Sequence, residues 1–165
     1  MQLAAFNRID AEAARAVVRP CVDIDRWVDA LVDGRPYSSM EALIEAARTR
    51  ALPWTVAEID GALAHHPRIG ERASGTSAEA SLSRSEQAGL GVQREDTAAA
   101  LAAGNRAYEE QFSRVFLIRA AGRSAEEILA SLRERLTHTD EEEIPVVADQ
   151  LRQIAILRLE GIFGS

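Results

Sequence analysis

The sequence contains no lysine, so all 19 of its basic side chains are arginines. Without an amine side chain, the protein cannot form a lysine Schiff base, hold pyridoxal phosphate through lysine, or use a phosphate-loop lysine. Cysteine occurs once, at Cys21, which excludes an intramolecular disulfide and favours the reducing cytoplasm.

Metal-binding and membrane-spanning patterns are also missing. Three histidines and one cysteine, with no His-Glu-x-x-His or Cys-x-x-Cys motif, predict no metal site. No apolar run approaches the roughly 18 residues of a membrane span, and the first residues lack the basic-then-apolar pattern of a signal peptide. Any catalysis is therefore expected to use His, Glu, Asp, Ser and Arg side chains.

The chain is acidic, with 26 aspartate and glutamate residues and a formal net charge of -7. Its arginines are scattered along the sequence and form no basic run. Binding of a nucleic-acid backbone needs clustered cations, so nucleic acid is not expected to be the main partner.

Apolar residues make up 47% of the 165 residues, which is enough for the core of one ordinary domain. They recur with helical spacing along most of the chain. Helices are predicted over 11–18, 24–32, 40–47, 56–63, 94–112, 125–136 and 143–162, and after Ser83. The predicted N-caps are Asp10, Asp23, Ser38 or Ser39, Thr55, Ser83, and Ser124 in a capping box with Glu127.

Three segments stand outside this helical pattern. Residues 70–82 lack periodicity and are predicted to form a long ordered loop. Residues 115–118 are the only strand-like run, and 137–143 form an acidic connection. The sequence therefore predicts a single all-α domain over residues 1–165, a bundle of about eight helices with one short extended segment near 115–118.

Two neighbouring motifs carry the residues best suited to chemistry: His65-His66-Pro67-Arg68-Ile69-Gly70-Glu71 and Ser83-Arg84-Ser85-Glu86-Gln87. An imidazole before a turn and a carboxylate near a helix start are plausible parts of an active site. Both also have structural explanations. Ser83 and Glu86 fit a capping box, and His66 could bind free carbonyls at a helix end. Taken alone, these residues favour the structural explanations.

The same motifs, with two others, resemble the 2-oxo-4-hydroxy-4-carboxy-5-ureidoimidazoline (OHCU) decarboxylases, which complete the route from urate to allantoin. The order and spacing match over nearly the whole chain. The resemblance is carried by His66-Pro67-Arg68-Ile69-Gly70-Glu71, Ser83…Glu86-Gln87-Ala88-Gly89, Asn105…Tyr108…Phe112 and Gln153…Arg158-Leu159. Where the family often has Phe-Gly-Phe-Pro-Phe, this sequence has Phe112-Ser113-Arg114-Val115-Phe116.

The resemblance implies an all-α, cofactor-independent decarboxylase, usually a homodimer, that forms (S)-allantoin from a small ureidoimidazoline. It implies catalytic roles for His66, Glu86 and Arg158. It further implies that the substrate is contacted by Pro67, Ser83, Gln87 and the backbone near Phe116 and Ile118.

Several alternatives remain open at the level of the sequence. The chain could be a catalytically silent helical ligand-binding module, or a ureide hydrolase in which His66 activates water. His65 could act in place of His66. Arg158, which lies along an apolar stripe, could extend its head to solvent or pair with a glutamate. Asn105 is expected to be buried and to bind backbone groups, and the acidic residues 140–143 are expected to be solvated near a helix start.

Overall fold

The computed structural model describes residues 1–71, 77–91 and 94–164. Across these ranges there are nine helices and no strand, which confirms the all-α prediction. The helix count exceeds the predicted eight because Leu3–Phe6 forms a short helix, α1, that the sequence pattern did not predict. The chain divides into two compact units, Met1–Ala62 with the chain from Arg152 onward, and Leu63–Leu151. The assignment of residues 1–165 to a single domain stays a prediction.

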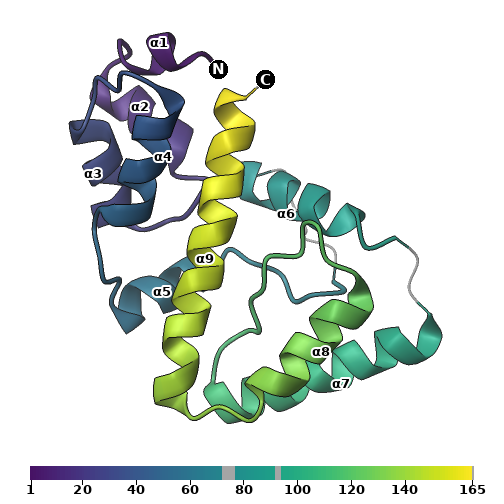
Figure 1. Cartoon of the computed structure of the whole chain (residues 1–165). Helices are drawn as coiled ribbons and strands as arrows, with labels where there is room; N and C mark the ends of the chain where they lie inside the picture. Colours follow the sequence, from purple (N-terminus) through teal and green to yellow (C-terminus); the bar gives the residue numbers. More distant parts are fainter. Residues whose placement is uncertain (72–76, 92–93, 165) are drawn as a thin grey trace. The chain divides into compact units, whose positions relative to one another are not determined.

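The first unit contains α1 and four further helices together with the C-terminal part of α9. Figure 1 shows α2, α3 and α4 gathered at one end of this unit. The bounds are α2 Ala11–Val18, α3 Asp25–Asp33, α4 Met40–Thr49, α5 Val56–Leu63 and α9 Asp140–Phe163. Residues at helical spacing form the core, as predicted: Ile24, Trp27, Val28, Leu31 and Leu43 are all at most 2% exposed.

The predicted N-caps of this unit are correct at three of four helices. Asp10 accepts a hydrogen bond from the Ala13 N–H at 2.8 Å, and Ser39 accepts one from the Ala42 N–H at 3.2 Å. Thr55 caps α5 by accepting the Glu58 N–H at 3.1 Å. The prediction for Asp23 is wrong, because Ile24 is the N-cap residue of α3 and Asp23 instead bonds Arg19 at 2.6 Å. The Asp23 carboxylate thus binds a cation, the guanidinium of Arg19, which lies directly after α2.

The second unit contains α6 (Ala78–Ala88), α7 (Glu95–Phe112), α8 (Ala125–Arg135) and the N-terminal part of α9. Helices α7 and α8 lie side by side (Figure 1). The predicted α7 stripe is buried, since Leu101, Asn105, Tyr108 and Phe112 are all at most 4% exposed. Gly104 permits the close approach of α7 to α8, because a Cβ at this position would lie 2.4 Å from Leu132 Cδ2.

Two helices begin earlier than predicted. Helix α6 starts at Ala78, because Ser77 accepts the Ala80 N–H at 3.1 Å, so residues 78–82 are helical and not part of a loop. The part of the predicted loop at 72–76 lies outside the described residues. Helix α9 starts at Asp140, within the predicted acidic connection. There Thr139 accepts the Glu142 N–H at 3.2 Å, while Glu142 accepts the Thr139 N–H at 3.3 Å, which is a reciprocal capping box.

Candidate functional site

His66 and Pro67 lie directly after α5. Residues 64 and 65 form a turn, and the His66 backbone N–H donates to the Leu63 carbonyl at 3.0 Å. The His66 side chain is half-buried, whereas His65 is exposed. His66 is therefore the more sheltered of the two imidazoles that the sequence left as candidates.

Ser83, Glu86 and Gln87 lie one turn apart on α6. Their i, i+3 and i+4 spacing places them on one side of the helix. Ser83 is 2% exposed, and Glu86 and Gln87 are half-buried. Because α6 begins at Ala78, Ser83 is inside the helix, so the capping-box prediction for Ser83 and Glu86 is wrong. A capping box therefore does not explain the presence of Ser83 and Glu86.

Gln87 contacts the turn that follows His66-Pro67. Its Oε1 accepts the Gly70 N–H at 3.1 Å, and its Nε2 lies 3.5 Å from the Arg68 carbonyl oxygen. The sequence pattern predicts a substrate contact for Gln87, which stays a prediction. The observed bonds show that Gln87 also links α6 to the 68–70 backbone.

Two side chains of helix α7 also form hydrogen bonds with this turn. The Asn105 Nδ2 donates to the Ile69 carbonyl at 2.9 Å, as expected for a buried asparagine that binds backbone groups. One turn later, Glu109 receives two hydrogen bonds from the Arg68 guanidinium, Nε–Oε1 at 2.5 Å and Nη2–Oε2 at 3.1 Å. Glu109 was not a sequence candidate, because its partner is 41 residues away and no local pattern marks the pair.

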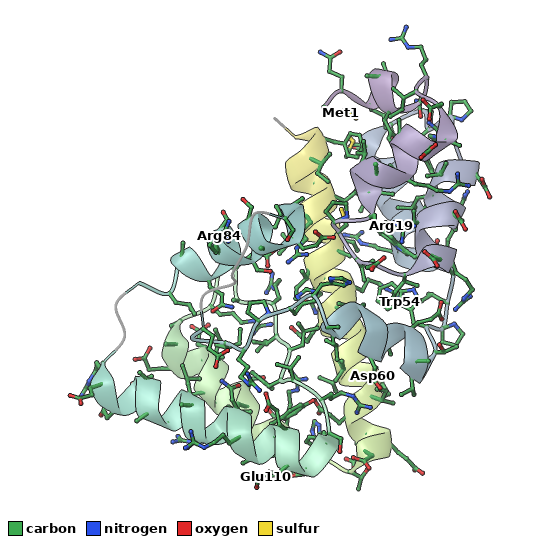
Figure 2. The ribbon with its side chains drawn as sticks, turned by 180° about the vertical axis from the view of Figure 1, so that it is seen from behind. Met1, Arg19, Trp54, Asp60, Arg84 and Glu110 are labelled. Atoms are coloured by element: carbon green, nitrogen blue, oxygen red, sulfur yellow. The ribbon has the colours of Figure 1, made fainter. Side chains whose placement is uncertain are left out.

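Two cavities of ligand size flank the 68–71 turn within the second unit. One of about 510 Å³ is bordered by the turn, by Arg84 and Gln87 of α6, and by residues 88–91. Figure 2 shows Arg84 on this helix. The other, of about 330 Å³, lies between the turn and the Ala98–Glu109 stretch of α7. Small-molecule sites typically occupy about 300–1,000 Å³, so either cavity has room for a small heterocycle.

Residues 115–118, predicted to be extended, lie in a stretch without assigned secondary structure between α7 and α8, and a buried arginine binds their backbone. Arg135, 3% exposed, donates Nη1 to the Leu117 carbonyl at 2.6 Å, and its guanidinium lies 4.6 Å from the Phe116 ring centroid. The Leu117 carbonyl that Arg135 binds lies between Phe116 and Ile118, the two residues whose backbone the sequence predicts to contact the substrate.

Arg135 belongs to a buried polar cluster with Glu143 and Tyr108. The Glu143 carboxylate is 0% exposed; its Oε1 accepts from Arg135 Nε at 2.6 Å and from the Tyr108 hydroxyl at 2.7 Å. Burial, with the hydrogen bond to Glu143, raises the pKa of Tyr108 above its ordinary value. The sequence-based prediction that residues 140–143 are solvated is thus wrong for Glu143. The charge is tolerated because both carboxylate oxygens are bonded, Oε2 to His138 Nδ1 at 2.8 Å.

Arg158 lies on α9 in the first unit. It is 3% exposed, and its Nη1 donates to the Pro20 carbonyl at 2.9 Å. The alternative in which the arginine head reaches solvent is therefore wrong. A buried guanidinium has lost its water and interacts more strongly with an anion than an exposed one does.

Metal sites and membrane-spanning helices are two other features that bear on function. In residues 1–71, 77–91 and 94–164, no group of three or more His, Cys, Asp or Glu side chains could hold a metal ion. Among the helices of the same ranges, none is long and apolar enough to cross a bilayer.

Comparison with known proteins gives matches over almost the whole chain. The family model described as OHCU decarboxylase matches residues 7–160. A 2-oxo-4-hydroxy-4-carboxy-5-ureidoimidazoline decarboxylase from Amia calva is 31% identical over 135 residues, 81% of this chain and 77% of that protein. A uric acid degradation bifunctional protein from Bacillus sp. (strain TB-90) is 25% identical over 168 residues. That match covers 99% of this chain but only 32% of the bifunctional protein, so the chain spans about a third of that relative.

Solved structures share the fold. A crystal structure of OHCU decarboxylase in the presence of (S)-allantoin aligns with a TM-score of 0.70 and 24% identity, over 95% of this chain and all of that one. A crystal structure of (S)-allantoin synthase aligns with a TM-score of 0.73 and 17% identity, over 99% of this chain and 54% of that one. The family model spans all three catalytic candidates and covers far more than half of the sequence. On this evidence the chain belongs to the OHCU decarboxylase family.

Proposed function

We propose that this protein catalyses the cofactor-independent decarboxylation of 2-oxo-4-hydroxy-4-carboxy-5-ureidoimidazoline to (S)-allantoin in urate degradation. One observation carries the proposal: the family match runs over residues 7–160, a range that contains His66, Glu86 and Arg158. The relative from Amia calva, whose name states this decarboxylase activity, supports the same reading.

The reaction sets three tasks for the protein. The bond between the hydroxyl-bearing ring carbon and its carboxylate breaks, CO2 leaves, and the electron pair passes into the adjacent C=N bond, whose nitrogen takes up a proton. The resulting enol becomes a carbonyl when it loses the hydroxyl proton and gains a proton on the neighbouring ureido-bearing carbon, so the substrate supplies its own electron sink. The protein must hold the anion, stabilise the developing negative charge, and deliver that proton to one face of the ureido-bearing carbon.

Arg158 is the proposed anion-binding residue. Its planar guanidinium can form paired hydrogen bonds to a carboxylate or to the carbonyl-rich ureido group. Its 3% exposure supports this role, because charge-assisted hydrogen bonds are stronger where water is excluded.

His66 is the proposed acid–base group, because imidazole changes its protonation near neutral pH. Glu86 is proposed to orient the His66 imidazole and to stabilise its charged form. Pro67, Ser83 and Gln87 are proposed substrate contacts. The common side of α6 on which Ser83, Glu86 and Gln87 lie supports their joint action, as does the bond from Gln87 to the turn after Pro67.

The backbone N–H groups of Phe116 and Ile118 are proposed to bind the oxygen on which negative charge grows. The Arg135 bond to the intervening Leu117 carbonyl, which holds this backbone in place, supports this role. One well-placed donor of this kind contributes about 2.7–4 kcal/mol to catalysis.

We also propose that the protein works as a homodimer in the cytoplasm and that neither nucleic acid nor a membrane is its partner. The family resemblance supports the dimer. The single, buried Cys21 supports a reducing compartment, and the net charge of -7 argues against nucleic acid.

The test is to generate the substrate freshly and to follow the circular dichroism of the allantoin that forms. Because the substrate also decays spontaneously to racemic product, both the rate and the enantiomeric excess must be measured. The wild-type protein is expected to accelerate the reaction and to yield (S)-allantoin, and H66N is expected to lose both effects. A wild-type rate equal to the spontaneous rate would refute the proposed function, and full rate with full enantiomeric excess in H66N would remove His66 from the mechanism.

A further inference from the structure

Side chains from two helices bind three consecutive residues, 68–70, in the turn after His66-Pro67. From α7, Glu109 binds the Arg68 guanidinium and Asn105 binds the Ile69 carbonyl at 2.9 Å. From α6, Gln87 binds the Gly70 N–H at 3.1 Å. Because residues 68, 69 and 70 are all bonded to these side chains, their backbone has little conformational freedom.

Asn105 has the most unusual environment of the three holding residues. It occupies a core position of α7 and is only 4% exposed. Its Nδ2 bonds to Ile69, whereas its Oδ1 is buried without a partner among the described residues. A carbonyl can only accept, so this bond also decides which end of the amide faces Ile69. A leucine of similar shape would leave no buried amide oxygen, so helix packing alone does not account for an asparagine here.

The backbone of the turn constrains His66, because a single rigid residue separates the two. Pro67 separates His66 from Arg68, and its ring fixes the backbone φ angle. On its other side, the His66 N–H is bonded to the Leu63 carbonyl at 3.0 Å. With its backbone held on both sides, His66 has a limited range of places for its imidazole.

We propose that Asn105, supported by the adjacent Arg68–Glu109 ion pair, is a positioning residue that sets the location of the His66 imidazole. The proposal rests on the proposed function insofar as His66 is the acid–base group. Neither Asn105 nor Glu109 touches substrate in this account; both act through the backbone and side chain of the turn.

The test compares Asn105→Leu with Gln111→Met. Gln111 also lies on α7, and its Nε2 donates to the carbonyls of Leu136 and His138 at 3.0 and 3.1 Å. Both substitutions remove an amide that binds backbone carbonyls and replace it with an apolar side chain of similar size. Only Asn105 binds the turn next to His66, so Gln111→Met controls for a general weakening of α7.

The first measurement is NMR of protein labelled with ¹³C-histidine, titrated across pH. The sequence has only three histidines, and His66→Asn identifies the His66 signal. Asn105→Leu is expected to shift the His66 signal and its titration midpoint and to leave His138 unchanged. Gln111→Met is expected to do the reverse. An unmoved His66 signal in Asn105→Leu overturns the proposal.

The second measurement is kcat and KM for the ureidoimidazoline, with unfolding by urea in parallel. Misplacement of a reacting group by about 1 Å can cost about a hundredfold in rate. Asn105→Leu is therefore expected to lower kcat by about ten- to a hundredfold with a smaller change in KM, and Gln111→Met to stay within about twofold of wild type. Equal losses of kcat in the two variants at equal stability would overturn the positioning role.

The ion pair gives a second matched comparison, Glu109→Gln with Glu110→Gln. Both remove one negative charge from α7, but Glu109 pairs with Arg68, whereas Glu110, labelled in Figure 2, is an exposed residue of the same helix. Only Glu109→Gln is expected to shift the His66 signal. If the wild-type protein shows no turnover, the proposed function fails, whereas the NMR comparison still decides whether the α7 side chains position His66.

Discussion

Gly104 is a position where a single added methyl group is expected to destabilise the protein. An alanine is favoured over glycine inside a helix by about 1 kcal/mol, so Gly104→Ala would stabilise α7 taken alone. In the folded protein the new Cβ would lie 2.4 Å from Leu132 Cδ2 and 3.2 Å from Leu132 Cγ. Carbon atoms in favourable contact lie about 3.5–4.0 Å apart, so α7 and α8 must separate or Leu132 must move by roughly 1 Å.

Leu132 has little room to move, because it is 0% exposed. Overpacking of this kind typically costs about 1–3 kcal/mol. Since the clash is severe, we take the upper end and subtract the gain in helix propensity. Gly104→Ala is then expected to lower the free energy of unfolding by about 2 kcal/mol.

Urea unfolding followed by far-UV circular dichroism measures the effect. Gly61→Ala in α5 is the control, since a Cβ there meets nothing within 4 Å; it is expected to raise the free energy of unfolding by up to about 1 kcal/mol. The double variant Gly104→Ala/Leu132→Ala removes the clashing atoms, so its loss is expected to be at least about 1 kcal/mol smaller than the sum of the single losses. If Gly104→Ala is as stable as the wild type while Gly61→Ala gains, the close approach of α7 and α8 is refuted.

Three other predictions concern the backbone, an ion pair and the proposed anion site. Ser113 has a φ of 57° at the position where the family often has glycine, so Ser113→Gly is expected to raise the free energy of unfolding by about 1 kcal/mol in urea titrations. A loss of stability would contradict the strain, and Ala51→Gly, with a φ of 55°, tests the same reasoning independently. Arg26 lowers the pKa of Glu58 from 4.5 to about 2, so the ionised Glu58 stabilises the fold above pH 4.5 and this contribution disappears as the pH falls towards 2. The stability difference between wild type and Glu58→Gln, measured by urea unfolding, should shrink over that range; a constant difference would contradict the linkage. Arg158→Lys keeps the charge but loses the planar fork, so kcat/KM is expected to fall by about a hundredfold or more at unchanged far-UV circular dichroism, and wild-type kinetics would exclude Arg158 as the anion site.

Much of the helical architecture follows from short-range patterns in the sequence. Asp10, Ser39 and Thr55 cap helices because their oxygens meet N–H groups only three residues ahead. The stripe from Leu101 to Phe112 is buried because its spacing places those side chains on one side of α7. The predicted start of α6 was wrong, because a second serine nearby also fits an N-cap. Ser77, and not Ser83, caps this helix.

The partners of the candidate site depended on contacts that no local pattern encodes. Asn105 binds Ile69 across 36 residues, and Glu109 binds Arg68 across 41. In the sequence, Glu143 belongs to an acidic run of the kind that is typical of a protein surface. In the folded protein it is buried and bonded to Tyr108, which is 35 residues away. Each of these pairs is determined by where α7 packs, which is a property of the whole chain.

The sequence by itself determined that this is an all-helical protein without lysine chemistry, and its motifs identified the family. Those features depend on composition and on periodicities that extend over a few residues. Only the tertiary structure decided that α7 holds the turn after His66, that Arg135 holds the Leu117 carbonyl, and that Arg158 is buried. Hydrogen bonding and desolvation act through space, so the neighbours that define a site appear only when distant segments have packed together.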